Sequence, residues 1–135
     1  DLILRGACIL PIDVPGLDGR IRVRSIIGRL LEHSRIFYFK VEQEENMWLS
    51  SADWMNRNMM RRVEIAWPIV DSENRARILQ ECCQMYLQDN QDAWLLNADG
   101  TYVLSAQRTL QPKSKSHEQA QAFSAQLQLM QKYAD

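Results

Sequence analysis

The sequence predicts an α+β (mixed α/β) fold in which a mixed β-sheet is flanked by helices. Stretches with the two-residue period of strands, such as Val63, Ile65 and Trp67, occur beside stretches with the helical period, such as residues 72–88. The two kinds of stretch do not alternate strictly along the chain, which favours a mixed arrangement over a doubly wound one. With 135 residues, 46% of them hydrophobic, the chain is long enough for one domain with its own core.

Local patterns place the elements of the first half. An apolar start bounded by Pro11 indicates a strand, and two prolines with two glycines in the next stretch indicate a loop. The period becomes helical after Ser25, a suitable N-cap, and the stretch after His33 is rich in aromatic and β-branched residues. The expected elements are a strand over 1–10, a loop over 11–19, an alternating stretch over 20–24, a short helix over 26–33, and a hairpin of strands 35–41 and 47–50 around a turn at 42–46.

The second half is placed by the same reasoning. Asp71 or Ser72 is a suitable N-cap for a helix whose apolar side includes Ile78, Leu79 and Tyr86. The turn sequence at residues 97–100 separates two short apolar segments. The expected elements are a helical turn or irregular segment at 54–58, a strand over 62–69, a helix from 71 or 72 to about 88, a hairpin of 93–96 and 101–104, a polar link at 113–116 and a helix over 118–133.

The net charge and the arginine content of the chain indicate which classes of binding partner it favours. The net charge is −1, so no overall field selects nucleic acid or an anionic membrane. Twelve of the 16 basic residues are arginines, whose guanidinium groups pair with phosphate or carboxylate through two donors at once. Five of them are clustered, at Arg20, Arg22, Arg24, Arg29 and Arg35. Composition alone also allows a solvated face paired with the glutamates of residues 42–45.

Three features of the sequence bear on the protein's context: its first segment, the length of its apolar runs and its cysteines. It begins at Asp1 with a segment that already has the pattern of a core strand, so we expect a piece of a longer protein. No apolar run reaches the ~18 residues of a membrane span. Three cysteines, Cys8, Cys82 and Cys83, make a poor disulfide framework and lack metal-binding spacing, which favours a reducing cytoplasm.

Three places carry candidate functional residues: Arg5 in the first strand, His33 with Arg35 where the expected helix gives way to the strand over 35–41, and the serines and aspartate that follow residue 49. An arginine near a histidine suits phosphoryl chemistry, because the arginine neutralises charge while the histidine moves or donates a proton. Ser50, Ser51 and Asp53 could supply hydroxyl donors and orient the imidazole. The alternatives are that His33 only ends a helix and that Asp53 is only an N-cap.

Several blocks in consistent order resemble bacterial polyphosphate kinases. They cover most of residues 1–105 and are more specific together than any single motif. The blocks are residues 2–6 (LILRG), 14–17 (VPGL), 21–29 (IRVRSIIGR), 31–36 (LEHSRI), 49–55 (LSSADWM), 61–64 (RRVE), 93–96 (AWLL) and 99–102 (DGTY). The resemblance implies that residues 1–135 are the C-terminal (C2) domain of a longer enzyme, with a phospholipase D-like fold.

The resemblance also implies an activity and a site. The family transfers the terminal phosphate of ATP reversibly to inorganic polyphosphate through a phosphohistidine, which would lie in a preceding domain absent here. Arg5 and His33 match positions that contact ATP, with His33 catalytic, while Arg35, Ser50, Ser51 and Asp53 lie in the same matching blocks. Mg²⁺ would arrive with the nucleotide, and we expect no protein metal site in this chain.

Further expectations follow from membership in such an enzyme. The partners would be ATP or ADP, polyphosphate, the preceding domains of the same polypeptide and further copies of it in a homo-oligomer, but no nucleic acid. The full-length enzyme would be cytoplasmic, with membrane association left open. The isolated domain should lack kinase activity because part of the phosphoryl relay is missing.

The sequence also leaves alternatives open, in one departure from the family pattern, in the roles of two arginines and in the function. Residues 8–13 (CILPID) differ from the family's usual sequence after the first strand, and Arg24 and Arg29 could contact ligand or pair structurally. One alternative function is a phospholipase D-like phosphodiesterase with His33 as nucleophile, although Arg35 stands where such enzymes have lysine. The other is a non-catalytic module that binds polyanions through its arginines.

Overall fold

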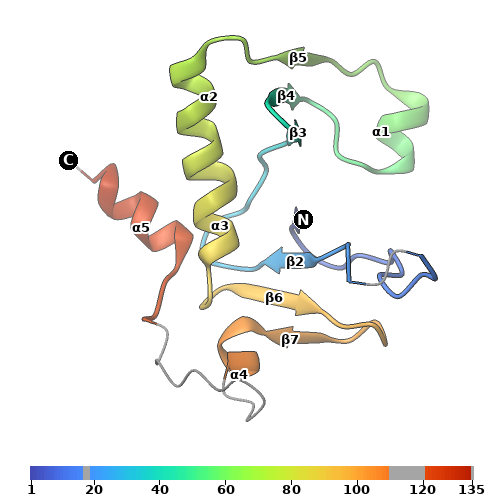
Figure 1. Cartoon of the computed structure of the whole chain (residues 1–135), viewed down its shortest axis with the longest axis vertical. Coiled ribbons are helices and arrows are strands. Elements are labelled where there is room, and N and C mark those ends of the chain that lie inside the picture. Colours follow the sequence, from blue (N-terminus) through green and yellow to red (C-terminus); the bar gives the residue numbers. More distant parts are fainter. Residues whose placement is uncertain (17–18, 110–120, 135) are drawn as a thin grey trace. The chain divides into compact units, whose positions relative to one another are not determined.

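The structure is a computed structural model that describes residues 1–16, 19–109 and 121–134 (Figure 1). The chain divides into two compact units. The first unit comprises Asp1–Glu32 together with Cys83–Asp135, and the second comprises His33–Cys82. The prediction of an α+β fold is confirmed, with one sheet in each unit.

The first unit contains a mixed four-stranded sheet in the order β1-β2-β6-β7. The strands are β1 (Leu2–Leu4), β2 (Val23–Ile26), β6 (Ala93–Leu96) and β7 (Tyr102–Leu104). β1 runs parallel to β2. The β2–β6 and β6–β7 pairs are antiparallel, as the arrows of these three strands in Figure 1 show. The β6–β7 hairpin confirms the turn that the sequence predicts at residues 97–100.

The core of the first unit joins the sheet to its helices. Its buried members are Ile26, Tyr86, Ala93 and Ala125. They come from β2, α3 (Met85–Gln88), β6 and α5 (Ala125–Lys132). A further short helix, α4 (Ser105–Thr109), follows β7 directly and was not predicted from the sequence.

A buried carboxylate links the end of α3 to the start of α5. The side chain of Asp89 accepts hydrogen bonds from the backbone N–H groups of Gln91 at 3.0 Å, Asp92 at 2.7 Å and Ala125 at 2.8 Å. Asp89 is only 1% exposed. One buried side chain therefore satisfies three backbone donors, of which the N–H of Ala125 is itself buried.

The second unit contains an antiparallel three-stranded sheet in the order β3-β4-β5. Its strands are β3 (Ile36–Val41), β4 (Glu44–Ser50) and β5 (Ala66–Pro68), and its helices are α1 (Asn56–Arg61) and α2 (Ser72–Ile78). The β3–β4 hairpin is the one that the sequence predicts, with a turn shortened to two residues. Glu42 in this turn has a positive φ of 53°.

The predicted helix that ends near Gln88 is confirmed as one continuous helical run (Figure 1). It begins at the N-cap Asp71, whose side chain accepts from the backbone N–H of Asn74 at 2.7 Å. Its middle, Leu79–Gln84, has π-helical hydrogen bonding, and α3 completes it. Such π segments within α-helices are uncommon.

The predicted helix over residues 26–33 is wrong. β2 continues through Ser25 and Ile26, and Ile26 pairs with Ala93 of β6. Ser25 caps no helix; its hydroxyl accepts from the backbone N–H of Gly6 at 2.8 Å. Residues 27–35, all of which the structure describes, form neither helix nor strand. The helical spacing is local, whereas pairing with a strand nearly 70 residues away decides the outcome.

Side-chain contacts hold part of this irregular segment in the first unit. The amide group of Gln126 donates to the carbonyl of Leu30 and accepts from its N–H, both at 2.8 Å. The carboxylate of Glu32 accepts from the hydroxyl of Tyr86 at 2.6 Å and from Gln126 at 2.5 Å. A Cβ atom at Gly28 would lie 2.5 Å from Gln126 Oε1, so a side chain at this position would disturb these contacts. The chain is therefore fixed at the residue immediately before His33.

Other predicted boundaries were too wide. The first strand ends at Leu4, because Gly6 turns the chain with a φ of +89°. The strand predicted over 62–69 is limited to Ala66–Pro68, and Val63 is fully exposed. The last helix begins at Ala125, after the N-cap Ser124. The predicted polar link at 113–116 and the residues 118–120 lie outside the described residues.

Candidate functional site

Five of the six predicted site residues lie in the second unit, at one end of the β3–β4 hairpin. His33 and Arg35 precede β3, Ser50 ends β4, and Ser51 and Asp53 follow it. The register explains their proximity: Ile36 pairs with Leu49, and the backbone N–H of Ser50 donates to the carbonyl of Arg35 at 2.9 Å. Aromatic and β-branched residues favour this hairpin, and its pairing brings residues about 15 apart in sequence side by side.

The side chains of His33, Arg35 and Asp53 form a contact cluster. Arg35 Nε donates to Asp53 Oδ1 at 2.7 Å, and Arg35 Nη2 lies 2.5 Å from His33 Nε2. His33 Nε2 also lies 3.4 Å from Asp53 Oδ1. The His33 side chain is 58% exposed, whereas those of Arg35 and Asp53 are 22% and 33% exposed. The imidazole is therefore open to a ligand while its two neighbours are more enclosed.

The chemistry of the three groups restricts their protonation. A guanidinium can only donate hydrogen bonds, so His33 Nε2 must be the acceptor in its contact with Arg35. A neutral imidazole in this contact carries its proton on Nδ1. A protonated Nε2 would instead donate to Asp53 and lose the contact with Arg35. The exposed imidazole of His33 can thus carry a donor on Nδ1 while Arg35 holds the other ring nitrogen.

The ion pair keeps Asp53 charged. The hydrogen bond from Arg35 is the main reason that the pKa of Asp53 is lowered, and the same bond raises the pKa of Arg35. The pKa of the Asp53 carboxyl is lower in the folded chain than in the unfolded one. The ion pair therefore stabilises the fold fully at pH values above the pKa of an ordinary aspartate. That contribution is lost only as the pH falls through the folded-state pKa. The ion pair of Arg35 and Asp53 is therefore present at neutral pH.

The two serines differ in how their hydroxyls are used. Ser50 Oγ accepts from the backbone N–H of Ala52 at 3.1 Å. Ser51 Oγ donates to Glu64 Oε2 at 2.5 Å and accepts from the N–H of Ile65 at 3.0 Å. The hydroxyl proton of Ser51 is thus donated to Glu64. Ser50 Oγ acts as an acceptor in its contact with Ala52, which does not use its hydroxyl proton. The predicted role of both as phosphate donors stays a prediction.

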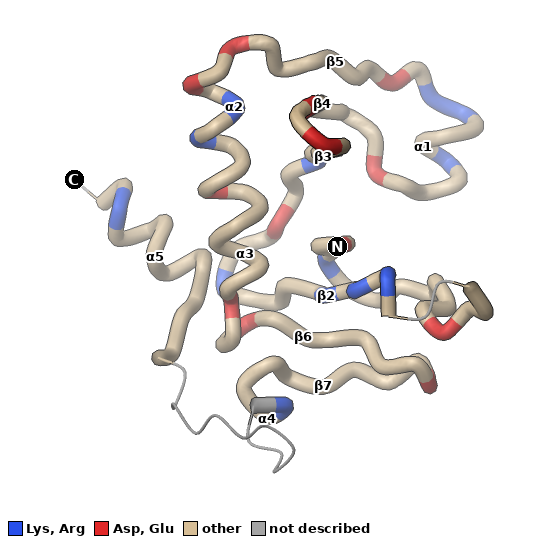
Figure 2. The backbone as a smooth tube through the Cα atoms, in the orientation of Figure 1, with Lys and Arg blue, Asp and Glu red and all other residues tan. Residues whose placement is uncertain are grey.

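The remaining candidate arginines lie in the first unit. Arg5 follows β1 and is exposed, and Arg29 is also exposed. Arg24, by contrast, has a clear structural role. Arg24 Nη1 donates to the carbonyls of Tyr86 at 3.0 Å and Leu87 at 2.6 Å, in the last turn of α3. Burial lowers the pKa of Arg24. Figure 2 shows the basic residues along the segment that leads into β2.

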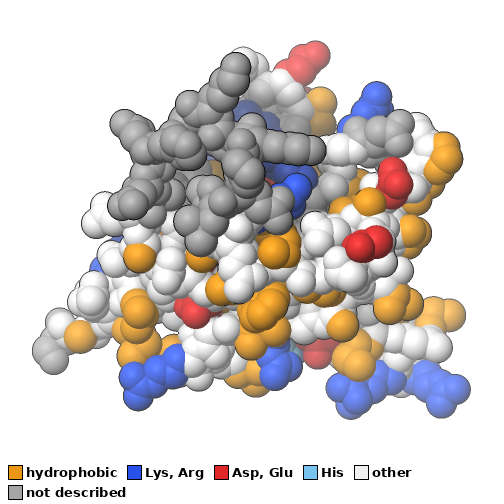
Figure 3. All heavy atoms as spheres, turned by 90° about the horizontal axis from the view of Figure 1, so that it is seen from below, with side chains coloured by type: hydrophobic (Ala, Val, Ile, Leu, Met, Phe, Trp, Pro, Cys, Tyr) orange, Lys and Arg blue, Asp and Glu red, His pale blue; other side chains and the backbone are white. Residues whose placement is uncertain are grey.

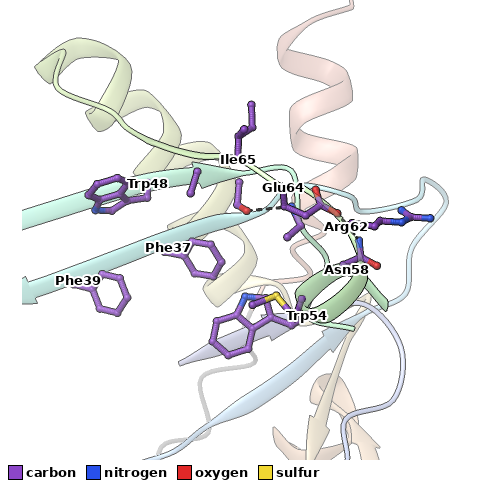
Figure 4. Close-up of a pocket in the computed structure, with 12 residues that line it drawn as sticks. Phe37, Phe39, Trp48, Trp54, Asn58, Arg62, Glu64 and Ile65 are labelled. Atoms are coloured by element: carbon purple, nitrogen blue, oxygen red, sulfur yellow. Dashed lines mark hydrogen bonds between the residues drawn. The ribbon is translucent and has the colours of Figure 1, made fainter. Parts of the chain in front are cut away.

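Two hollows in the second unit were not predicted. The larger has a volume of about 580 Å³ and lies beside an aromatic face of the sheet (Figure 4). The smaller, of about 290 Å³, contains Arg35 and Ser50 of the candidate site. Phe37, Phe39 and Trp48 line the larger one, and the ring centroids of Phe37 and Trp54 are 5.7 Å apart. The signal was the alternate spacing of residues 37 and 39, which places both on one face of β3.

The tryptophans lie at the rim of the hollows or on the surface rather than in a core. Trp54 is 76% exposed, and Trp48 and Trp67 are also exposed. Figure 3 shows hydrophobic side chains reaching the surface between basic and other polar groups.

Two features are absent from the described ranges: a cluster of metal-ligating side chains and a helix able to span a membrane. No group of three or more His, Cys, Asp or Glu residues within them is arranged to hold a metal ion. Within the same ranges, no helix is both long enough and apolar enough to cross a membrane.

Comparison with known proteins agrees with the resemblance. The family model described as polyphosphate kinase C-terminal domain 2 matches residues 1–121. The polyphosphate kinase of Burkholderia ambifaria is 53% identical over 102 residues, which cover 76% of this chain and 15% of that protein. The polyphosphate kinase of Paraburkholderia phytofirmans has the same identity and the same coverage. The chain thus spans about 15% of the length of these curated relatives.

A solved structure supports the fold. The crystal structure of polyphosphate kinase from Porphyromonas gingivalis superposes with a TM-score of 0.70 and 29% sequence identity. The match covers 89% of this chain and 17% of that one. The predicted phospholipase D-like, mixed α+β fold is confirmed by this match and by the family model. The chain therefore belongs to the polyphosphate kinase family, in which it corresponds to C-terminal domain 2.

Proposed function

We propose that this chain is the phosphate-gripping C-terminal domain of an enzyme that transfers the terminal phosphate of ATP reversibly to inorganic polyphosphate. The observation that carries the proposal is the cluster of His33, Arg35 and Asp53 at the end of the β3–β4 hairpin, in a chain of this family. Arginine beside an exposed imidazole is an arrangement suited to a phosphoryl group whose charge must be neutralised during transfer.

In this proposal each member of the cluster has its own task. Asp53 and His33 engage two of the five N–H donors of Arg35, which leaves others to bind phosphate oxygens. Asp53 holds the guanidinium in one orientation, so less freedom is lost when a phosphate binds. His33 would donate from Nδ1 to the transferring phosphoryl or to the oxygen on the leaving side. Ser50, Ser51 and Arg5 would add further contacts.

The rest of the relay would come from outside this chain. The phosphohistidine would be carried by a preceding domain of the same polypeptide, and Mg²⁺ would enter with ATP or ADP. We infer a cytoplasmic homo-oligomeric enzyme in which residues 1–135 form the last catalytic domain. The isolated chain would then bind phosphate compounds without completing the reaction.

A labelling experiment tests this division of labour. The 135-residue chain is incubated with γ-labelled ATP and Mg²⁺, and covalent label is measured at alkaline pH, where a phosphohistidine persists. A polyphosphate kinase that carries this chain as its C-terminal domain is treated in parallel. We expect label and chain growth only in the complete enzyme.

The alternatives give different results in the same assay. Label retained by the isolated chain, and lost in His33→Ala, would show that His33 is itself the nucleophile. Cleavage of a chromogenic phosphodiester by the chain would then support the phosphodiesterase. Binding of polyphosphate that weakens steeply with salt, together with a complete enzyme that is unaffected by His33→Ala, would indicate the non-catalytic polyanion-binding module.

A further inference from the structure

Glu64 joins the two ends of the loop that carries Asp53. Its Oε2 accepts from the hydroxyl of Ser51 at 2.5 Å, and its Oε1 accepts from the side-chain amide of Asn58 at 3.1 Å. Asn58 is buried, with 4% of its surface exposed, and Glu64 is half-buried. Figure 4 shows Glu64 and Asn58 together at the edge of the larger hollow. A carboxylate is suited to this position because its two oxygens can accept from two donors at once.

The loop between these two contacts is fixed at further points. The backbone of Ser51 donates to the carbonyl of Ile65 at 3.0 Å, and the N–H of Ile65 donates back to Ser51 Oγ at 3.0 Å. Within the loop, the N–H of Met55 donates to the carbonyl of Asp53 at 2.7 Å. The carboxylate of Asp53 therefore has a defined position, although Asp53 lies in an irregular segment.

The position of the Asp53 carboxylate affects the orientation of Arg35 and His33. Asp53 accepts from Arg35 Nε, and Arg35 in turn contacts His33 Nε2. A shift of the loop would thus move the guanidinium and change which side of the imidazole faces outward. Displacement of a catalytic group by about 1 Å can lower a rate about 100-fold.

We propose that Glu64 is a positioning residue for phosphoryl transfer, which fixes the loop of Asp53 and through it the orientation of Arg35 and His33. The proposal rests on the proposed function, since it assigns to Glu64 a role in that same site. Glu64 acts through its neighbours and does not touch the phosphate.

Three variants test the role of Glu64 in a polyphosphate kinase that carries this chain. Glu64→Ala removes both acceptors, whereas Glu64→Gln keeps one oxygen for Asn58 and an amide group that can donate to Ser51 Oγ. Glu44→Ala is the matched control, because Glu44 is an exposed glutamate on β4 of the same unit. His33→Ala is made as well, and kcat and KM for ATP are measured for every variant.

The expected result is a fall in kcat of roughly 10- to 100-fold in Glu64→Ala, with a smaller change in KM. Glu64→Gln should stay within about threefold of wild type, as should Glu44→Ala. Equal losses of kcat in Glu64→Gln and Glu64→Ala would overturn positioning as the cause, and so would an unchanged kcat in Glu64→Ala while His33→Ala is impaired. An unchanged rate in His33→Ala would instead refute the proposed function.

Discussion

Replacement of His33 by alanine should lower the rate of polyphosphate synthesis at least about 100-fold, the lower end of what a general acid or base contributes. The variant is made in a polyphosphate kinase that carries this chain. His33 is exposed and its Nε2 is held by Arg35, so the imidazole can meet a phosphoryl group with a fixed orientation. Its loss removes the proton donor while Arg35 and Asp53 keep their ion pair.

The measurement separates two steps. Transfer of label from ATP to the enzyme and growth of the polyphosphate chain are followed independently, and both should fail in His33→Ala. The chain's other histidine, His117, lies outside the described residues and directly follows the polar link that the sequence predicts at 113–116. His117→Ala is therefore the control and should retain activity. Near-normal activity of His33→Ala would show that His33 only precedes the strand.

Replacement of Asp89 by alanine should destabilise the first unit by about 3 kcal/mol, because three backbone N–H groups, one of them the buried N–H of Ala125, would lose their acceptor. These groups lie on both sides of the junction between α3 and α5, so the helices would lose their common anchor. The free energy of unfolding is measured by urea denaturation, with amide exchange used to follow the first unit separately.

An exposed aspartate in the same unit provides the control for Asp89. Asp99 accepts from the N–H of Thr101 at 3.0 Å and from its hydroxyl at 2.6 Å, in the turn between β6 and β7. Asp99→Ala should cost less than about 1 kcal/mol, because water replaces these contacts. Equal effects of the two substitutions would contradict the account of Asp89 as a buried anchor.

The sequence predicted the part of the site that depends on local pattern. Residues 35–41 and 47–50 have strand composition around a polar turn, and the resulting hairpin brings Arg35 beside Ser50. The pairing of His33 with Arg35 followed from their separation of two residues. These features could be predicted because neighbouring strands pair without help from distant segments.

The parts that the sequence missed depend on distant contacts. The helix expected at 26–33 is replaced by a strand end at Ile26, since its partner Ala93 lies far along the chain. Glu64 appeared only as one letter in a matching block, yet it connects Ser51 to Asn58. Arg24 could not be separated from the ligand-binding arginines until its contacts with α3 were seen.

The most direct test of the central claim is an NMR titration of the 135-residue chain with tripolyphosphate at constant ionic strength. The signals to follow are the ring nitrogens of His33 and the Nε–H of Arg35. Arg22→Ala is the matched control, because Arg22 also pairs with an aspartate, Asp1, at 2.7 Å but in the first unit. The account predicts saturable changes at both groups, retained in Arg22→Ala and lost at His33 in Arg35→Ala. Saturable binding that leaves His33 and Arg35 unchanged would contradict it.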